Sequence, residues 1–196
     1  LGEYIERDIN KAFYFFSLLA NQNYPRAHFF LGAFYEEGKY VERDINKAIY
    51  YYSLASNQNI KQAQHNLGLI YYYGIYVERD INKVIHYLSL AANLNYANSQ
   101  FILGLIYFEG KYIERDINKA IYYFTLAANQ NHPDAQCNLA TIYHKGRYVK
   151  RDINKAIHYY SLAANQNIQL AQFKLGLIYR RGKYVERDIN KSIYYY

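Results

Sequence analysis

The chain has 196 residues, of which 52% are hydrophobic and 20% are charged, with a formal net charge of +7. This composition is typical of a folded protein, and the absence of any run of about 18 apolar residues excludes a transmembrane segment. Cys137 is the only cysteine, which excludes an internal disulfide and favours a reducing compartment. We therefore expect a cytoplasmic location.

The motif Arg-Asp-Ile-Asn-Lys occurs six times at intervals of 36 residues, beginning at Arg7, Arg43, Arg79, Arg115, Arg151 and Arg187. A unit of that length that cannot bury its own apolar face must stack on its neighbours. The sequence therefore predicts one array with a partial repeat at 1–23, full repeats at 24–59, 60–95, 96–131 and 132–167, and a truncated repeat at 168–196. Because the chain begins without Met and ends inside the second helix of the last repeat, we expect both ends to be cut.

Each repeat is predicted to begin with a helix, as the repeat at 60–95 illustrates. Ala63, Leu67, Gly68 and Tyr71 recur at i, i+4, i+5 and i+8, which places them on one helical face. Gly74 follows this pattern at the place where a glycine usually ends a helix.

A second helix is predicted in the same repeat after Asp80, whose carboxylate can accept hydrogen bonds from the backbone N–H groups of the first turn. Ile81, Val84 and Leu88 belong to an apolar stripe along this helix. Asn95 closes the repeat, and asparagine tolerates the left-handed backbone conformation of a helix end. Each repeat is thus predicted to fold as a helix, a loop and a second helix.

One repeat carries the pattern Ala63-x-x-x-Leu67-Gly68-x-x-Tyr71-x-x-Gly74, then Val77-x-x-Asp80-x-x-Lys83, then Ala91-Ala92. This pattern resembles the Sel-1-like repeat family, a relative of the tetratricopeptide repeats, and the resemblance covers the whole chain. It implies an all-α fold, a right-handed α-solenoid of stacked antiparallel two-helix repeats. Two positions depart from the family: Tyr76 stands where a second loop glycine is common, and Asn95 replaces the usual closing glycine.

The resemblance also implies a function, because proteins of this family serve as adaptor subunits of larger complexes. By analogy with tetratricopeptide arrays, the first helices line the concave side of the superhelix. Comparison of the repeats within the chain shows that variation concentrates on this face of the first helix. We therefore expect a non-catalytic scaffold or adaptor that binds an extended segment of a protein partner in the concave groove.

The candidate groove residues are Phe29, Glu36, Glu37, His65, Tyr72, Tyr73, Phe101, Phe108, Glu109, His144, Lys145, Phe173, Arg180 and Arg181. Their charge changes from acidic in the first full repeat to basic in the last. A partner with a basic end, an apolar or aromatic middle and an acidic end matches this order. The same pattern also arises where solvated positions vary under weak constraint.

Two other functions remain open on the sequence. The protein can be an architectural element that docks along an acidic periodic polymer, such as a cytoskeletal filament, through a basic edge that includes Lys39, Lys47 and Lys111. Alternatively, the array is the docking segment of a longer enzyme. An exposed row of second-helix tyrosines, including Tyr50, is a further candidate contact surface. Nucleic acid is not favoured, because no known reading motif is present.

Catalysis by the repeats themselves is not expected. No two histidines have the i, i+3 or i+4 spacing that places two metal ligands on one helix face, and one cysteine cannot form a zinc cluster. Cys137 and His144 are two helical turns apart, too far for a direct hydrogen bond between a nucleophile and its base. We expect no metal and no cofactor.

Overall fold

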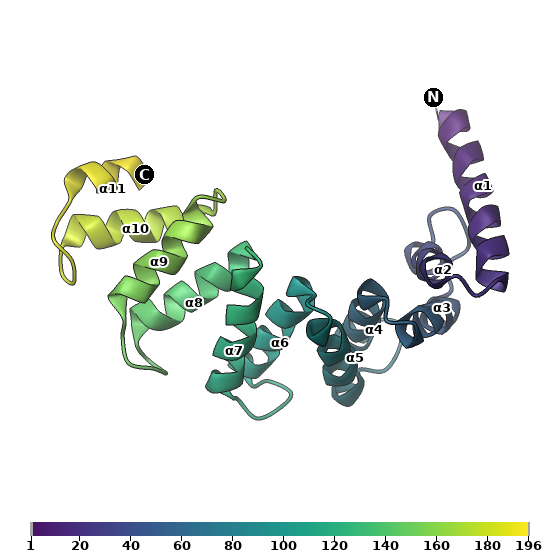
Figure 1. Ribbon diagram of the computed structural model, residues 1–196, viewed down its shortest axis with the longest axis horizontal. Helices are drawn as coiled ribbons and strands as arrows, with labels where there is room; N and C mark the ends of the chain where they lie inside the picture. The colour runs from purple at the N-terminus through teal and green to yellow at the C-terminus, as the bar shows by residue number, and fades with distance from the viewer. Residues whose placement is uncertain (1, 196) are drawn as a thin grey trace. The chain divides into compact units, whose positions relative to one another are not determined.

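The computed structural model describes residues 2–195, and the side chains of residues 9–195. In this part of the chain every regular element is a helix, and the helices alternate as the repeats predict (Figure 1). The all-α fold of stacked two-helix repeats is confirmed. The helices are α1 (Gly2–Asn21), α2 (Pro25–Glu37), α3 (Ile45–Asn57), α4 (Lys61–Tyr73), α5 (Ile81–Asn93), α6 (Ala97–Glu109), α7 (Ile117–Asn129), α8 (Pro133–Lys145), α9 (Ile153–Ala164), α10 (Gln169–Arg181) and α11 (Ile189–Tyr195).

The helices form two compact units, unit 1 (residues 1–99) and unit 2 (residues 100–196). In unit 1, α2 packs on α1 and α3, and α4 packs on α3 and α5 (Figure 1). In unit 2, α8 packs on α7 and α9, and α10 packs on α9 and α11. Helices inside each unit therefore have neighbours on two sides, which explains why they carry apolar residues around much of their circumference.

The predicted start and stop signals of the helices are confirmed by their geometry. The side chains of Asp44, Asp80, Asp116 and Asp152 each accept a hydrogen bond from the backbone N–H of the lysine three residues later. The first helix ends at a glycine with positive φ, for example Gly74 at 62°. The repeat closes at an asparagine in the same left-handed region, with φ between 55° and 62°.

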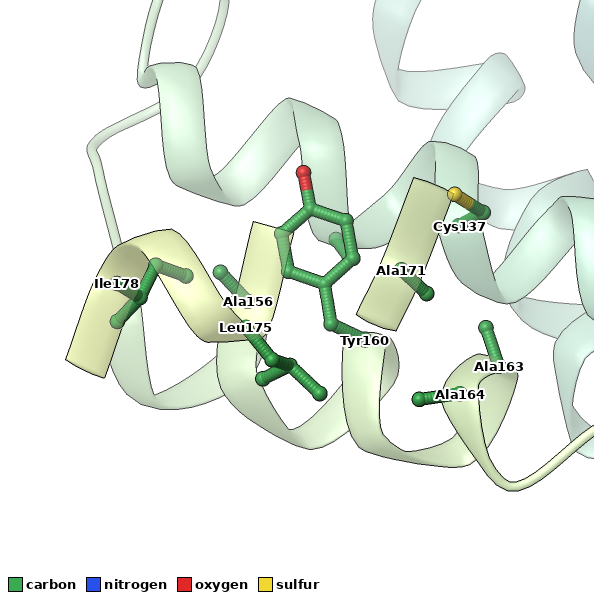
Figure 2. Close-up of a cluster of buried hydrophobic side chains, with 9 residues drawn as sticks. Cys137, Ala156, Tyr160, Ala163, Ala164, Ala171, Leu175 and Ile178 are labelled. Carbon is green, nitrogen blue, oxygen red and sulfur yellow. The ribbon is translucent and has the colours of Figure 1, made fainter. Parts of the chain in front are cut away.

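In the full repeats, a large side chain on the second helix packs against a small residue on the first helix of the same repeat. Phe124, on α7, lies so close to α6 that a Cβ atom at Gly104 would be 2.5 Å from its ring. In unit 2, Tyr160 fills the same role on α9, surrounded by alanines and Leu175 (Figure 2). The glycine of the first helix is therefore a packing residue that permits close approach of two helices.

The lysine of the repeated motif lies on a stacked pair of tyrosines. In the first full repeat, the rings of Tyr35 and Tyr51 stack with centroids 5.7 Å apart, and Lys47 Nζ lies 5.1 Å from the Tyr35 centroid. Lys47 also lies 3.6 Å from Asp44. The same lysine, tyrosine pair and aspartate recur in every full repeat of unit 2 and in its last repeat. This shared contact explains why the second helix hardly varies between copies.

The arginine of the motif joins one repeat to the next. The Arg43 guanidinium donates to the backbone oxygen of Glu37 at 3.0 Å and to the hydroxyl of Tyr76, 33 residues further along, at 2.6 Å. In unit 2, Arg151 donates in the same way to Tyr184. The loop tyrosine that replaces a glycine is thus a contact between successive repeats.

Candidate functional site

The candidate residues of α2, in unit 1, differ in exposure and in partner. The Phe29 ring is half-buried and lies 5.8 Å from the ring of Tyr52. The Glu36 carboxylate accepts a hydrogen bond from the Tyr52 hydroxyl at 2.6 Å. Glu37 is exposed. Phe29 and Glu36 therefore contribute to packing, and only part of each side chain remains accessible.

The candidate residues of α4 divide into a buried histidine and two surface tyrosines. His65 is 9% exposed, and its Nδ1 lies 2.9 Å from the Ser99 hydroxyl of the next repeat. Burial lowers the pKa of His65 to about 4. Tyr73 is 57% exposed, and its ring meets the edge of Tyr72. His65 is thus a packing residue, whereas most of the Tyr73 side chain is exposed at the surface.

Unit 1 also contains a pocket of about 500 Å³ at the start of its first helices. Phe29 is one of its walls, and Leu94, which is 38% exposed, is another. The full set of lining residues is Arg26, Phe29, Phe30, Asn59, Ile60, Lys61, Gln62 and Leu94. This pocket is mainly apolar and contains no carboxylate.

The two phenylalanines predicted on α6, in unit 2, pack against residues of the following repeat. The Phe101 ring stacks on His132, with centroids 4.5 Å apart, and Phe108 meets the edge of Tyr148 at 5.6 Å. Both are half-buried, and Glu109 beside them is exposed. Only part of each ring is therefore accessible at the surface.

A basic pocket of about 420 Å³ lies in unit 2 and includes side chains of α8, α9 and α10. We call this the α8–α10 pocket. It brings together three predicted residues, His144, Lys145 and Arg181; Arg180 and Phe173 are exposed outside it. Its lining residues are Thr141, His144, Lys145, Arg151, Tyr160, Lys174, Leu177, Ile178, Arg181, Lys183 and Tyr184.

Positive charge dominates the α8–α10 pocket. Among the described residues, no carboxylate lies within salt-bridge distance of Lys145, Lys174, Arg181 or Lys183. Burial lowers the pKa of His144, and the neighbouring Lys174 lowers this pKa further, as do the other cations of the pocket. The pocket therefore favours an anion.

The innermost polar group of the α8–α10 pocket is the hydroxyl of Tyr160. Its ring belongs to the core, where Figure 2 shows it beside Leu175 with the hydroxyl pointing away from Ala163 and Ala164. The hydroxyl oxygen lies 3.1 Å from Thr141 Oγ1. Burial raises the pKa of Tyr160, so its hydroxyl keeps its proton and can donate a hydrogen bond to a ligand.

Sequence reasoning missed Lys174 and Tyr160 as members of this site. Lys174 lies on the same face of α10 as Ile178 and Arg181, at i, i+4 and i+7, and this spacing is a signal that could have found it. Tyr160 gives no such signal, because its equivalents in other repeats, Leu88 among them, are plain core residues.

The described residues contain no group of three or more His, Cys, Asp and Glu side chains arranged to hold a metal ion. Cys137 is buried, and burial raises the pKa of its thiol. No helix in the described part of the chain combines the length and apolarity that a membrane span needs. What the site offers chemically is charge and hydrogen-bond donors.

The fold and site define a helical repeat protein with a variable, partly charged first-helix surface. The family model of the Sel1 repeat matches residues 1–24, 25–60, 61–96, 97–132, 133–168 and 169–196. The chain therefore belongs to the Sel1 repeat family, as the resemblance of its repeat pattern predicted. Sel1 repeat proteins are generally non-catalytic scaffolds for protein interactions.

Solved structures support the same assignment. A Sel1 repeat protein from Oxalobacter formigenes is 30% identical with a TM-score of 0.82, over 94% of this chain and 76% of the other. The cysteine-rich protein B of Helicobacter pylori is 30% identical with a TM-score of 0.52, over 68% of this chain and 96% of the other. The protective antigen c5321 of uropathogenic Escherichia coli is 26% identical with a TM-score of 0.57, over 92% of this chain and 46% of the other. No curated protein matches the chain.

Proposed function

We propose that this chain is a non-catalytic scaffold that binds an extended segment of a protein partner through its first helices. The observation that carries the proposal is the α8–α10 pocket, where two successive first helices place His144, Lys145 and Arg181 around one cavity. These positions differ from repeat to repeat, whereas the residues that hold the repeats together do not.

The first and second helices of a repeat differ in the contacts that their side chains make, and this difference supports the proposal. In unit 2, the second-helix residues Lys119 and Tyr123 contact Tyr107 of the first helix and the capping residue Asp116, and these contacts recur in the later repeats. The first helices present exposed side chains that have no such shared role, including Tyr73 and Phe173, which is 47% exposed. Exposed aromatic and arginine side chains commonly dominate the energy of protein interfaces.

The partner segment carries both apolar and charged side chains in this proposal. Tyr73 and Phe173 are the apolar anchors, and the charged first-helix ends orient the segment. In unit 1 that end is Glu36–Glu37, and in unit 2 it is Arg180–Arg181. A basic side chain of the partner suits the acidic end in unit 1, and an acidic side chain suits the basic end in unit 2.

The test compares an immobilised wild-type chain with a variant that carries Tyr73→Ser and Phe173→Ser. The control carries Tyr50→Ser and Tyr122→Ser, which remove two equally exposed aromatic rings from the second helices; these rings are 58% and 59% exposed. We expect mass spectrometry to find a protein that the wild type and the control retain from native lysate at moderate salt. The first-helix variant is expected to lose it.

Two outcomes contradict the proposal. In one, the first-helix variant and the wild type retain the same proteins. In the other, retention is lost only from a third variant, with Lys39→Glu, Lys111→Glu and Arg147→Glu, and is abolished by high salt. That second result would assign binding to the basic edge and to an acidic polymer.

A further inference from the structure

Two of the described second helices, α3 in unit 1 and α9 in unit 2, carry a tyrosine at the same core position. Tyr52 in unit 1 and Tyr160 in unit 2 are 0% and 1% exposed. In unit 1, the Tyr52 hydroxyl donates to Glu36 Oε2 at 2.6 Å and accepts from Asn66 Nδ2 at 3.0 Å. In unit 1, a carboxylate from the protein itself therefore accepts the hydrogen bond of this tyrosine hydroxyl.

Unit 2 has the same hydroxyl without the carboxylate. His144 occupies the position of Glu36, and Lys174 occupies the position of Asn66. The hydroxyl of Tyr160 is instead paired with Thr141, which stands where unit 1 has an alanine. The exchange of an acid and an amide for a histidine and a lysine turns a closed hydrogen-bond network into the cationic α8–α10 pocket.

We infer that the α8–α10 pocket binds a carboxylate side chain from an acidic segment of the protein partner. The carboxylate takes the place on the Tyr160 hydroxyl that Glu36 takes on the Tyr52 hydroxyl. Lys174 supplies the opposite charge beside it, in place of the Asn66 amide. This inference rests on the proposed scaffold function and names the chemistry of the partner at one site.

Further cations fix the direction from which the acidic segment arrives. Lys145 and Arg181, at the ends of α8 and α10, are exposed and line the pocket. The Arg151 guanidinium is held between the backbone oxygen of Lys145 and the Tyr184 hydroxyl, so it forms a fixed wall. Several cations around one cavity suit a segment with neighbouring acidic residues, because charge-assisted hydrogen bonds are stronger than neutral ones.

The pocket suits a peptide carboxylate better than a nucleic-acid backbone. Leu177 and Ile178 give it apolar walls, which fit the methylene groups of a glutamate side chain. A nucleic acid presents a regular series of phosphates and needs a continuous basic stripe. The matching first-helix positions of unit 1 carry Glu36 and Glu37 instead. The first-helix ends are thus basic in unit 2 and acidic in the first full repeat of unit 1.

The test measures binding of fluorescein-labelled hexaglutamate to the full chain by fluorescence anisotropy at physiological salt. His144→Glu installs the carboxylate that unit 1 has at this position and is expected to abolish measurable binding. Lys174→Asn installs the residue of unit 1 and is expected to weaken binding about tenfold. Lys150→Asn removes one charge from an exposed loop residue outside the pocket and is expected to change binding less than about twofold.

Equal weakening by Lys174→Asn and Lys150→Asn would overturn the inference, because it would show attraction by net charge alone. Tighter binding of a short oligothymidine than of hexaglutamate, lost in His144→Glu, would also overturn it and assign the pocket to phosphate. Circular dichroism checks that each variant folds, and the two pocket variants test the inference independently.

The inference and the scaffold function fail separately. In one outcome, the wild type retains a partner, the Tyr73→Ser and Phe173→Ser variant loses it, and His144→Glu binds it with unchanged affinity. This result would support the scaffold function and refute the carboxylate site. Hexaglutamate binding that depends on Lys174, together with no partner lost from the first-helix variant, would leave the carboxylate site standing and refute the proposed partner surface.

Discussion

A buried glutamine in unit 1 has lost the partner that its equivalent in unit 2 keeps. Gln136 Oε1 accepts a hydrogen bond from Gln166 Nε2 at 2.9 Å. Gln64 is 1% exposed, and its Nε2 donates to a backbone oxygen, but its Oε1 has no protein partner. The reason is that Leu94 stands where unit 2 has Gln166. An unsatisfied buried acceptor costs about 1–3 kcal/mol.

Leu94→Gln is therefore expected to stabilise the protein. The new amide reaches Gln64 Oε1 as Gln166 reaches Gln136, and the free energy of unfolding is expected to rise by about 1 kcal/mol in urea denaturation. Leu94→Asn is the control, because its amide is one methylene too short. Equal stability of the two variants would contradict this explanation.

Burial of His65 makes stability depend on pH. Because the folded pKa of about 4 lies below the ordinary value of 6.5, protonation favours the unfolded chain. The contribution of neutral His65 is complete above about pH 6.5 and is lost as the pH falls toward 4, with a limit of about 3 kcal/mol. His65→Phe, the residue found at the same place in Phe29 and Phe101, is expected to reduce this loss. Urea denaturation of both proteins at pH 7 and pH 5 measures this loss of stability. The same pH dependence in His65→Phe and the wild type would show that other groups cause the loss.

At the scale of the helix, the asparagine that closes each repeat holds a strained backbone conformation. Asn131 has φ of 60°, and its backbone N–H donates to Ala128 at 2.9 Å. Asn131→Ala is expected to lower the free energy of unfolding by about 1 kcal/mol, because alanine tolerates this conformation poorly. Asn131→Gly is the matched control and is expected to equal or exceed the wild type in thermal unfolding. A stable alanine variant would mean that the turn can change its conformation.

Helix boundaries were predictable from the sequence because they depend on neighbours a few residues apart. Asp80 caps the residue three positions later, and Gly74 ends its own helix, so spacing alone reveals both. The contacts of Arg43 with Tyr76 and of His65 with Ser99 join residues more than 30 positions apart. No local pattern encodes such pairs.

The sequence predicted the charged residues of the candidate site but not the depth of its pocket. The change from acidic to basic first-helix ends identified His144, Lys145 and Arg181, which share one pocket. The depth of that pocket depends on Tyr160, a side chain whose position looks like ordinary core in the sequence. A hydroxyl at the edge of a core becomes visible only when the packing is known.

At the scale of the whole chain, stability follows the number of neighbours that each helix has. In a repeat array each repeat contacts only its neighbours. The free energy of local opening is therefore lowest where a helix packs against another helix on one side only. Ile193 in the seven-residue α11 is 69% exposed, whereas Ile121 lies in α7 and is packed against buried core. Hydrogen exchange of the 196-residue chain, followed by mass spectrometry, is expected to show faster exchange at Ile193. Equal protection at low protein concentration would contradict this.

The stacked tyrosine pairs are expected to give each repeat a similar near-ultraviolet circular dichroism signal. The chain has 27 tyrosines and no tryptophan, so its near-ultraviolet circular dichroism arises chiefly from tyrosine. Among the described residues, Tyr35–Tyr51, Tyr71–Tyr87, Tyr107–Tyr123, Tyr143–Tyr159 and Tyr179–Tyr195 all stack with ring planes within 7° of parallel. Each folded repeat therefore contributes one similar chromophore pair. Loss of the signal in steps would count repeats as they unfold, without any label.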